Sequence, residues 1–196
     1  MNYPLRSPYY GIYEYFGLQR VSYKTTLMTA DALIKGCGYN LEKGLFSDDP
    51  RLYKPSDIVV NYPIFIPGVK ALNNKQWFYE VSRIKREHSR HKLIIGDELN
   101  SILLARGSKD MTQSEFCVYV WQMPKMDNML LYTNNQITGV DVIIRDATWA
   151  TIMPLGHDNH IDYSVIHNYG LTVDRGLRFN GVHKIQELFD SYAPAV

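Results

Sequence analysis

The residues most suited to chemistry are two adjacent carboxylates that follow a short apolar run. Asp97 and Glu98 come directly after Lys92-Leu-Ile-Ile-Gly96. A buried parallel strand has this kind of apolar run, and open α/β sheets bind ligands at the carboxyl ends of their strands. Phosphoryl transfer requires one carboxylate near a metal ion and one polar group that orients the attacking water. On this segment alone, a strand that ends in a polar loop is the more ordinary interpretation.

A lysine–threonine pair earlier in the chain is the second candidate for chemistry. Residues 11–16 favour a strand because they are aromatic and β-branched, and residues 27–34 favour a helix. Between them lie Gly17 and the pair Lys24-Thr25. Strand, loop, Lys-Thr and helix form the context of a phosphate-binding P-loop, and the free N–H groups of a helix amino terminus suit an anion. We expect Lys24 to reach the β- and γ-phosphates of ATP and the Thr25 hydroxyl to lie on Mg²⁺.

The loop departs from the usual Gly-x-x-x-x-Gly-Lys-Ser/Thr spacing. Gly17 is one residue further from Lys24 than the pattern requires, and Tyr23 replaces the glycine before the lysine. Glycine there lets the backbone turn tightly near the phosphate. A tyrosine requires a different loop path or weakens nucleotide binding, so the loop alone is a weak signal. The order of the two segments strengthens the hypothesis, because P-loop ATPases also place the loop before the acidic strand.

Composition indicates an ordinary globular protein. The chain has 196 residues, 45% hydrophobic and 21% charged residues, and a net charge of +1. One domain, residues 1–196, is therefore expected, and any DNA contact must be local because no global basic signature is present. Cys37 and Cys117 have neither metal-ligand spacing nor a disulfide framework, so we expect free thiols. No apolar run approaches the ~18 residues of a membrane helix, so no transmembrane segment is predicted.

Hydrophobic periodicity and turn residues predict alternating strands and helices. The predicted strands are 11–16, 57–62 with a continuation over 64–69, the run before Asp97, 129–133, 148–153, 161–168 and 171–179. The predicted helices are 24–35, 75–87, 98–105, 112–123, 140–146 and 182–190. Thr112 and Glu115 form a capping box at the start of one of them. This order predicts an α/β fold of three layers with a mainly parallel central sheet and a small β-rich carboxyl-terminal part.

Four stretches carry a family resemblance: Leu93-Ile-Ile-Gly-Asp-Glu98, Ala105-Arg106-Gly-Ser108, Met129-Leu-Leu-Tyr-Thr-Asn-Asn135 and Val140-Asp141-Val-Ile-Ile-Arg145. They resemble the viral genome-packaging ATPases of the FtsK–HerA superfamily, which include those of archaeal viruses such as the Sulfolobus turreted icosahedral viruses. The filamentous-phage Zot proteins are more distant relatives. The closing run Glu187-Leu-Phe-Asp-Ser-Tyr192 also resembles the carboxyl end of this family.

The resemblance assigns roles to individual residues. It implies that Asp97 holds Mg²⁺, often through water, and that Glu98 is the general base that aligns the attacking water. Asn135 matches a glutamine that contacts the γ-phosphate. Arg106 matches an arginine finger inserted into the site of a neighbouring subunit, and Arg145 matches a second arginine that is a weaker finger candidate.

Ordinary surface roles remain open for both arginines, and some family positions differ. Arg106 can equally pair with Asp110 or Glu98, whereas capping of its own helix or pairing with Asp141 is the favoured interpretation of Arg145. The family has an arginine at the position of Ile143 and an Arg-Lys pair at Pro124-Lys125.

Together, these features predict a P-loop NTPase of the RecA/FtsK-like kind with ATP and Mg²⁺ as cofactors. The predicted cofactor-binding residues are Gly17, Ser22, Tyr23, Lys24, Thr25 and Thr26. The resemblance implies an ATP-driven translocase that packages double-stranded DNA, a homo-oligomeric ring such as a hexamer, and a capsid or portal vertex partner in the host cytoplasm at the assembling virion. The alternatives are another P-loop motor for conjugation, secretion or phage assembly, and a weakly catalytic nucleotide-binding structural protein, which Tyr23 favours.

Two further patterns have ordinary explanations that we favour. The run Arg83-Ile-Lys-Arg-Glu-His-Ser-Arg-His-Lys92 is the one basic cluster, and it can be a DNA-facing patch or a solvated helix end, where cations suit the helix dipole. His157-Asp-Asn-His160 has the appearance of a metal-binding pair. Asp-Asn between two predicted strands is more simply explained as a turn.

Overall fold

The computed structural model describes residues 10–17, 23–104, 112–136 and 140–189. In these residues one sheet of eight strands has the order β3-β2-β4-β5-β1-β6-β7-β8, and neighbours from β3 to β6 are parallel while β6-β7 and β7-β8 are antiparallel. The strands are β1 (Gly11–Phe16), β2 (Ile58–Val60), β3 (Lys70–Ala71), β4 (Leu93–Gly96), β5 (Met129–Asn134), β6 (Ala150–Gly156), β7 (His160–His167) and β8 (Thr172–Asn180).

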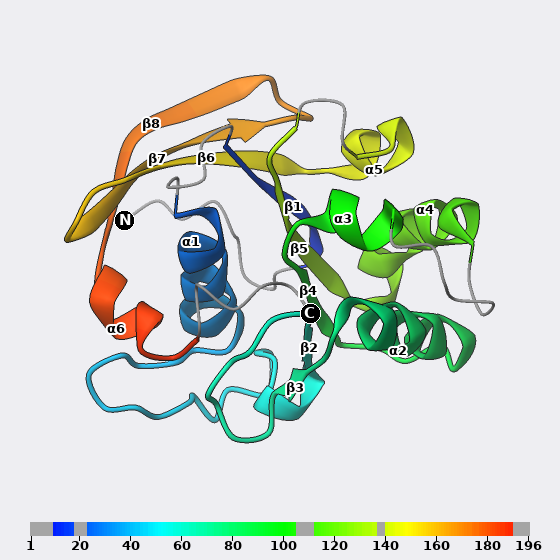
Figure 1. The fold of residues 1–196 in the computed structure, drawn as a ribbon, viewed down its shortest axis with the longest axis horizontal. Coiled ribbons are helices and arrows are strands. Elements are labelled where there is room, and N and C mark those ends of the chain that lie inside the picture. The colour runs from blue at the N-terminus through cyan, green and yellow to red at the C-terminus, as the bar shows by residue number, and fades with distance from the viewer. Residues whose placement is uncertain (1–9, 18–22, 105–111, 137–139, 190–196) are drawn as a thin grey trace.

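Helices cover the two faces of this sheet unequally. Figure 1 shows α1 and α6 on one face and α2, α3, α4 and α5 on the other. The helices are α1 (Lys24–Ala30), α2 (Asn74–Arg86), α3 (Leu99–Leu104), α4 (Gln113–Gln122), α5 (Val142–Ala147) and α6 (Val182–Gln186). The π-helical segment Asp31–Gly36 continues α1. The molecule therefore has the three layers that the sequence predicts.

The core forms two apolar clusters, one on each face of the central strands. Alternate residues of one strand enter different clusters, because successive side chains point to opposite faces. In β4, Ile95 packs in the cluster beside α1, and Ile94 packs in the cluster beside α2 and α4. Every residue of β4 and β5 is buried. This double coverage explains why their sequences are continuous apolar runs rather than alternating ones.

The antiparallel strands β6 and β7 are covered on one face only, and β8 is mostly exposed. Ile152 and Val165 are fully buried in the α1-side cluster, whereas Met153 and Leu155 on the opposite face of β6 are 42% and 59% exposed. An antiparallel sheet tolerates this arrangement because it can pack one face on the core and expose the other.

Most predicted elements are confirmed, and the differences have local causes. The expected helix over residues 24–35 changes from α to π geometry after Ala30. The expected strand over residues 57–62 is confined to Ile58–Val60, and residues 64–69 form no strand. Pro63 and Pro67 bound this region, and proline cannot donate to a sheet ladder.

Smaller expectations from the sequence are also confirmed. Thr112 and Glu115 form the predicted capping box, with distances of 3.2 Å and 2.7 Å between each side chain and the backbone nitrogen of the other. Cys37 and Cys117 are free and buried. Among the described residues, every helix is too short or too polar to cross a bilayer.

Candidate functional site

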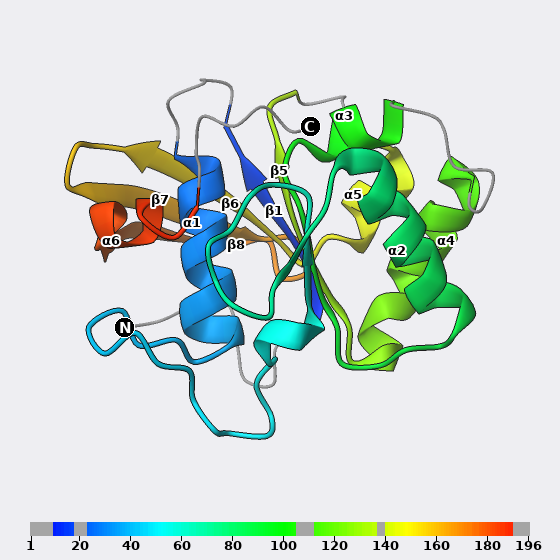
Figure 2. The same cartoon turned by 60° about the horizontal axis from the view of Figure 1, so that its bottom comes forward.

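The carboxyl ends of the central parallel strands form one edge of the sheet, and the predicted site residues gather there. Figure 2 shows the ends of β1, β4 and β5 at this edge, together with the starts of α1 and α3. The edge brings Lys24 and Thr25, at the start of α1, close to Asp97 and Glu98, which link β4 to α3. This is the place where open α/β sheets bind ligands.

Asp97 receives two hydroxyl hydrogen bonds on one carboxylate oxygen. Thr25 Oγ1 donates to Asp97 Oδ1 over 2.8 Å, and Thr133 Oγ1 donates to the same atom over 2.7 Å. These residues come from α1, from the turn after β4 and from the end of β5. A hydroxyl and a carboxylate are hard oxygen ligands, which Mg²⁺ prefers, so the Thr25–Asp97 pair fits this ion.

The backbone of the acidic pair is fixed by two side chains that sequence reasoning did not assign to the site. Asn61 accepts a hydrogen bond from the Asp97 N–H over 2.6 Å and donates to the Asp97 carbonyl over 2.9 Å. Thr133 Oγ1 accepts the Glu98 N–H over 2.7 Å. Glu98 is exposed and has a φ of 51°, a left-handed conformation that is rare outside glycine. Asn61 and Thr133 are polar residues at the ends of apolar strands, and this pattern is the sequence signal that could have identified them.

Lys24 is placed between the loop and the acidic pair. Its Nζ donates to the Gly17 carbonyl over 3.0 Å. Burial lowers the pKa of Lys24, and the negative charges of Asp97 and Glu98 oppose this decrease. The Gly17 N–H donates in turn to the Asn134 carbonyl over 3.2 Å. The lysine therefore lies at the start of α1 within electrostatic reach of both carboxylates, and its hydrogen-bond partner Gly17 is tied to β5.

Tyr23 adopts the backbone conformation that a glycine would normally supply. It precedes α1 with φ 57° and ψ 28°, in the left-handed region, which costs an L-residue about 1–2 kcal/mol. Its ring packs on Gly156 at the end of β6, where a Cβ atom would lie only 1.7 Å from a ring carbon. The tight turn before Lys24 is thus present despite the tyrosine, and the glycine that the ring needs lies in β6.

A buried carboxylate on the central strand β1 joins the site to β6. Glu14 is 8% exposed and accepts hydrogen bonds from Asn134 Nδ2 and from Thr151 Oγ1, each over 3.0 Å. Glu14 is not among the residues predicted from the sequence, although it is the one acid in an otherwise apolar and aromatic strand. Since the Asn134 backbone carbonyl also accepts the Gly17 N–H, Glu14 helps to hold the end of β5 against which Gly17 is fixed.

Two amides lie beside the acidic pair. Asn135 follows β5, and its Oδ1 is 3.5 Å from Asn100 Nδ2 on α3, a long distance for a hydrogen bond. Asn100 is 6% exposed, and its Oδ1 has no hydrogen-bond partner among the described residues. Asn135 therefore lies at the end of β5 beside α3, and its role in contacting a phosphate stays a prediction.

The remaining predicted site residues have different positions. Thr26 is buried in the first turn of α1. Arg145 is half-buried on α5, and its charge opposes the rise in the Tyr132 pKa that burial causes. Asp141, its suggested partner, caps α5 by accepting the Ile143 N–H over 2.8 Å. Ser22 and Arg106 lie outside the described residues, as does Asp110.

The basic run over residues 83–92 lies at the opposite edge of the sheet, before β4 begins. Most of its lysines and arginines contact carboxylates. Arg83 binds Glu80 and Glu87 over 2.6 Å each. The other short pairs are Arg90–Asp127 at 2.8 Å and Lys92–Asp57 at 2.6 Å. These contacts favour the helix-end interpretation over a surface that binds phosphates.

The comparisons with known proteins establish the fold. No family model matches the sequence, and no curated protein matches it. The fold is similar to the N-terminal domain of zonular occludens toxin from Neisseria meningitidis, with a TM-score of 0.58 and 10% identity over 92% of this chain and 100% of that one. It is also similar to the genome packaging NTPase B204 of Sulfolobus turreted icosahedral virus 2 in complex with AMPPCP, with a TM-score of 0.52 and 10% identity over 85% of this chain and 97% of that one.

This chain has the α/β fold of P-loop NTPases. The predicted fold class is therefore confirmed. At this level of identity the likeness concerns the fold alone, and the roles of individual residues stay predictions.

Proposed function

We propose that the chain is an ATPase that binds MgATP at the carboxyl edge of β1, β4 and β5. The observation that carries this proposal is the 2.8 Å hydrogen bond from Thr25 Oγ1 to Asp97 Oδ1, beside Lys24. The two residues are 72 positions apart in the sequence, so the fold alone brings them together. A lysine, a hydroxyl and a carboxylate in this arrangement are the parts that cradle phosphates and Mg²⁺ in P-loop NTPases.

Each part has a defined task in the proposed reaction. Lys24 exchanges its hydrogen bond with the Gly17 carbonyl for contacts with the β- and γ-phosphates. Thr25 and Asp97 would hold Mg²⁺, directly or through water, and the bound ion would neutralise charge on the phosphate oxygens. Glu98 orients water for in-line attack on the γ-phosphate, and its exposure leaves the carboxylate accessible. Asn135 contacts the γ-phosphate from the end of β5.

We further propose that hydrolysis drives the packaging of double-stranded DNA into a viral capsid. The resemblance of residues 92–146 to packaging ATPases and the shared fold with the packaging NTPase B204 support this proposal. The protein would then act as a homo-oligomeric ring, hexameric by family analogy, at a capsid or portal vertex in the host cytoplasm. Arg106 would reach the site of the neighbouring subunit and stabilise the transferring phosphoryl group.

The conformation of Tyr23 favours one alternative, a weakly catalytic nucleotide-binding protein. Its ring and left-handed backbone occupy the position that glycine has in efficient phosphate loops. If the ring restricts the loop, Tyr23→Gly raises ATP turnover. Turnover that is fast in the wild type and lower in Tyr23→Gly argues against this alternative.

The decisive experiment compares ATP turnover of the wild type with that of Glu98→Gln. Glu42→Gln is the matched control, because Glu42 is exposed and follows the end of the helical segment 24–36 that is opposite Lys24. We expect Glu98→Gln to lower turnover at least about 100-fold, as for loss of a general base, while Glu42→Gln stays within about twofold. A folded Glu98→Gln variant with wild-type turnover, or a wild type without turnover, contradicts the proposed function.

The first alternative is another P-loop motor of conjugation, secretion or phage assembly. A second measurement distinguishes a motor that acts on double-stranded DNA from a motor that acts on a protein. Double-stranded DNA should stimulate turnover, and the stimulation should fall steeply with salt because phosphate contacts release counterions. Turnover that is insensitive to DNA favours a motor that acts on a protein.

A third experiment tests the arginine finger. Mixing Arg106→Ala subunits with Lys24→Ala subunits should restore part of the ATPase activity if the finger acts between subunits.

A further inference from the structure

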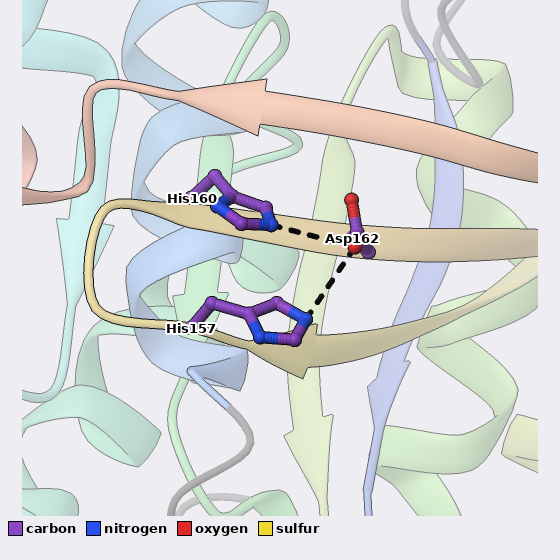
Figure 3. A group of neighbouring side chains, drawn as sticks. All are labelled: His157, His160 and Asp162. Atoms are coloured by element: carbon purple, nitrogen blue, oxygen red, sulfur yellow. Dashed lines mark ion pairs between the residues drawn. The ribbon is translucent and has the colours of Figure 1, made fainter.

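The hairpin between β6 and β7 brings three potential metal ligands together outside the nucleotide site. His157 follows β6, and His160 and Asp162 belong to β7. Figure 3 shows both imidazole rings directed toward the Asp162 carboxylate. The Nε2 atoms of His157 and His160 lie 3.4 Å and 3.5 Å from Asp162 Oδ2. Three donor atoms from two adjacent chain segments therefore converge on one point.

The separation of these atoms suits a shared ion better than direct hydrogen bonds. Both distances exceed the roughly 2.7–3.2 Å of a good N–H···O hydrogen bond. Ligands about 2.0–2.1 Å from a tetrahedral zinc ion lie about 3.3 Å from each other. The three ligand atoms are all within 4.8 Å of one another. Small movements of the two rings would thus complete the coordination.

We propose that His157, His160 and Asp162 bind one Zn²⁺ ion through Nε2, Nε2 and Oδ2. Two imidazoles and one carboxylate are typical zinc ligands, and three protein ligands leave a fourth position for water. The two nitrogen ligands select a transition metal over Mg²⁺ and Ca²⁺, which prefer oxygen. The proposed ion joins the end of β6 to the start of β7.

The local backbone already holds the ligands in place. The His157 N–H donates to the His160 carbonyl over 2.9 Å and closes the hairpin around Asp158 and Asn159, so the turn interpretation of the sequence stands. His160 and Asp162 alternate with the buried Ile161 and therefore share the face of β7 away from the core. The two imidazoles are stacked, with centroids 4.5 Å apart and planes 17° apart. The His157–His160 pair in the sequence offers only two ligands. The third is Asp162, which lies on the same face of β7 as His160.

Arg178 on β8 orients the carboxylate and keeps it ionised. Its Nε donates to Asp162 Oδ1 over 2.7 Å and its Nη2 to Oδ2 over 3.1 Å. These hydrogen bonds lower the pKa of Asp162, so the carboxylate is available as a metal ligand at neutral pH. A zinc ion on Asp162 Oδ2 competes with the 3.1 Å hydrogen bond from Arg178 Nη2. The 2.7 Å hydrogen bond from Arg178 Nε to Oδ1 can persist. The arginine charge opposes a cation, so we expect a moderate zinc affinity.

The test is titration of the metal-stripped full chain with Zn²⁺, followed by calorimetry. We expect one Zn²⁺ per chain, with the affinity lowered at least about tenfold in His157→Ala, His160→Ala and Asp162→Asn. His167→Ala is the matched control, because His167 on β7 makes a 2.9 Å hydrogen bond to Asp174 on β8 without a second imidazole. This control should stay within about twofold of the wild type.

Two further measurements test zinc binding without relying on calorimetry or on ATP turnover. Zn²⁺ should raise the melting temperature of the wild type and of His167→Ala but not of His157→Ala, since a ligand stabilises the state that binds it. Co²⁺ should give the visible spectrum of a tetrahedral site in the wild type. No zinc binding by the wild type, or equal loss of affinity in His167→Ala and His157→Ala, overturns the proposal. No nucleotide is used, so failure here leaves the proposed ATPase function untouched.

Discussion

At the scale of single residues, the candidate site is organised around one carboxylate oxygen. Asp97 Oδ1 accepts hydrogen bonds from Thr25 and Thr133, and Thr133 also accepts the backbone N–H of Glu98. One hydroxyl thus fixes both acids, the proposed Mg²⁺ ligand and the proposed base. Because Thr133 positions both Asp97 and Glu98, its replacement should lower the rate of catalysis although its own hydroxyl has no proposed role in the reaction.

Replacing Thr133 tests this positioning role. Thr133→Val keeps the shape but leaves the Glu98 N–H without its acceptor, which costs about 1–3 kcal/mol of unfolding free energy. We expect ATP turnover to fall at least about tenfold, whereas Thr133→Ser, which keeps the hydroxyl, retains most of it. Steady-state turnover and urea unfolding measure the two effects. Wild-type turnover in folded Thr133→Val would show that the hydroxyl does not position the acids.

At the scale of elements, the loop before α1 depends on β6. The Tyr23 ring occupies the space above Gly156, so the left-handed turn before Lys24 and the end of β6 are packed as one unit. Neither residue is informative alone in the sequence. The contact joins the parallel half of the sheet to its antiparallel half.

A double-mutant cycle measures this contact. Gly156→Ala places a methyl group into the Tyr23 ring and should destabilise the protein by about 1–3 kcal/mol, as for other overpacked sites. In the Tyr23→Gly background the same substitution should cost less than about 0.5 kcal/mol, because the ring is absent. Urea unfolding of the four proteins gives the coupling. Equal costs in both backgrounds would show that the ring does not pack there.

The element α2 provides a pH-dependent prediction. Glu80 is 6% exposed and binds Arg83 over 2.6 Å and Lys70 over 2.9 Å, and these contacts lower its pKa from 4.5 to about 2. The folded pKa lies below the unfolded one, so the stabilisation is complete above about pH 4.5 and is lost as the pH falls toward 2.

Substitution of Glu80 gives the corresponding measurement. Glu80→Gln should cost on the order of 2 kcal/mol at pH 7, because it removes the buried carboxylate charge that Arg83 and Lys70 both contact. The cost should shrink at pH 3. Glu87→Gln, which removes the exposed partner of the same Arg83, should cost less than about 1 kcal/mol. Urea unfolding at the two pH values separates the variants, and a cost for Glu80→Gln that is independent of pH would contradict the linkage.

The sequence predicts what is local in these elements and misses what depends on strand order. Residues 11–16 are identified by their aromatic and β-branched side chains and residues 93–96 by a continuous apolar run, and Thr112 marks a helix start by its own capping chemistry. Asn61 and Glu14 could not be assigned, because their partners come from other strands and become neighbours only in the sheet.

At the scale of the whole molecule, the sheet order brings the two predicted segments together. Strand β1, which leads to Lys24, pairs with β5, and β5 pairs with β4, which leads to Asp97. Apolar patterns predict each strand but not this order, since pairing of distant strands depends on packing across the whole sheet. The resemblance to a known family supplied the expectation that the lysine and the acids meet, and the sheet order produces that meeting.

The most direct test of the central claim is the binding of AMPPCP with and without Mg²⁺, measured by calorimetry. The claim predicts Mg²⁺-enhanced binding by the wild type, at least about tenfold weaker binding by Lys24→Ala, and loss of the Mg²⁺ enhancement in Asp97→Asn. The exposed controls Lys43→Ala and Asp48→Asn should bind like the wild type. No binding by the wild type, or wild-type affinity and Mg²⁺ dependence in folded Lys24→Ala and Asp97→Asn, would contradict it.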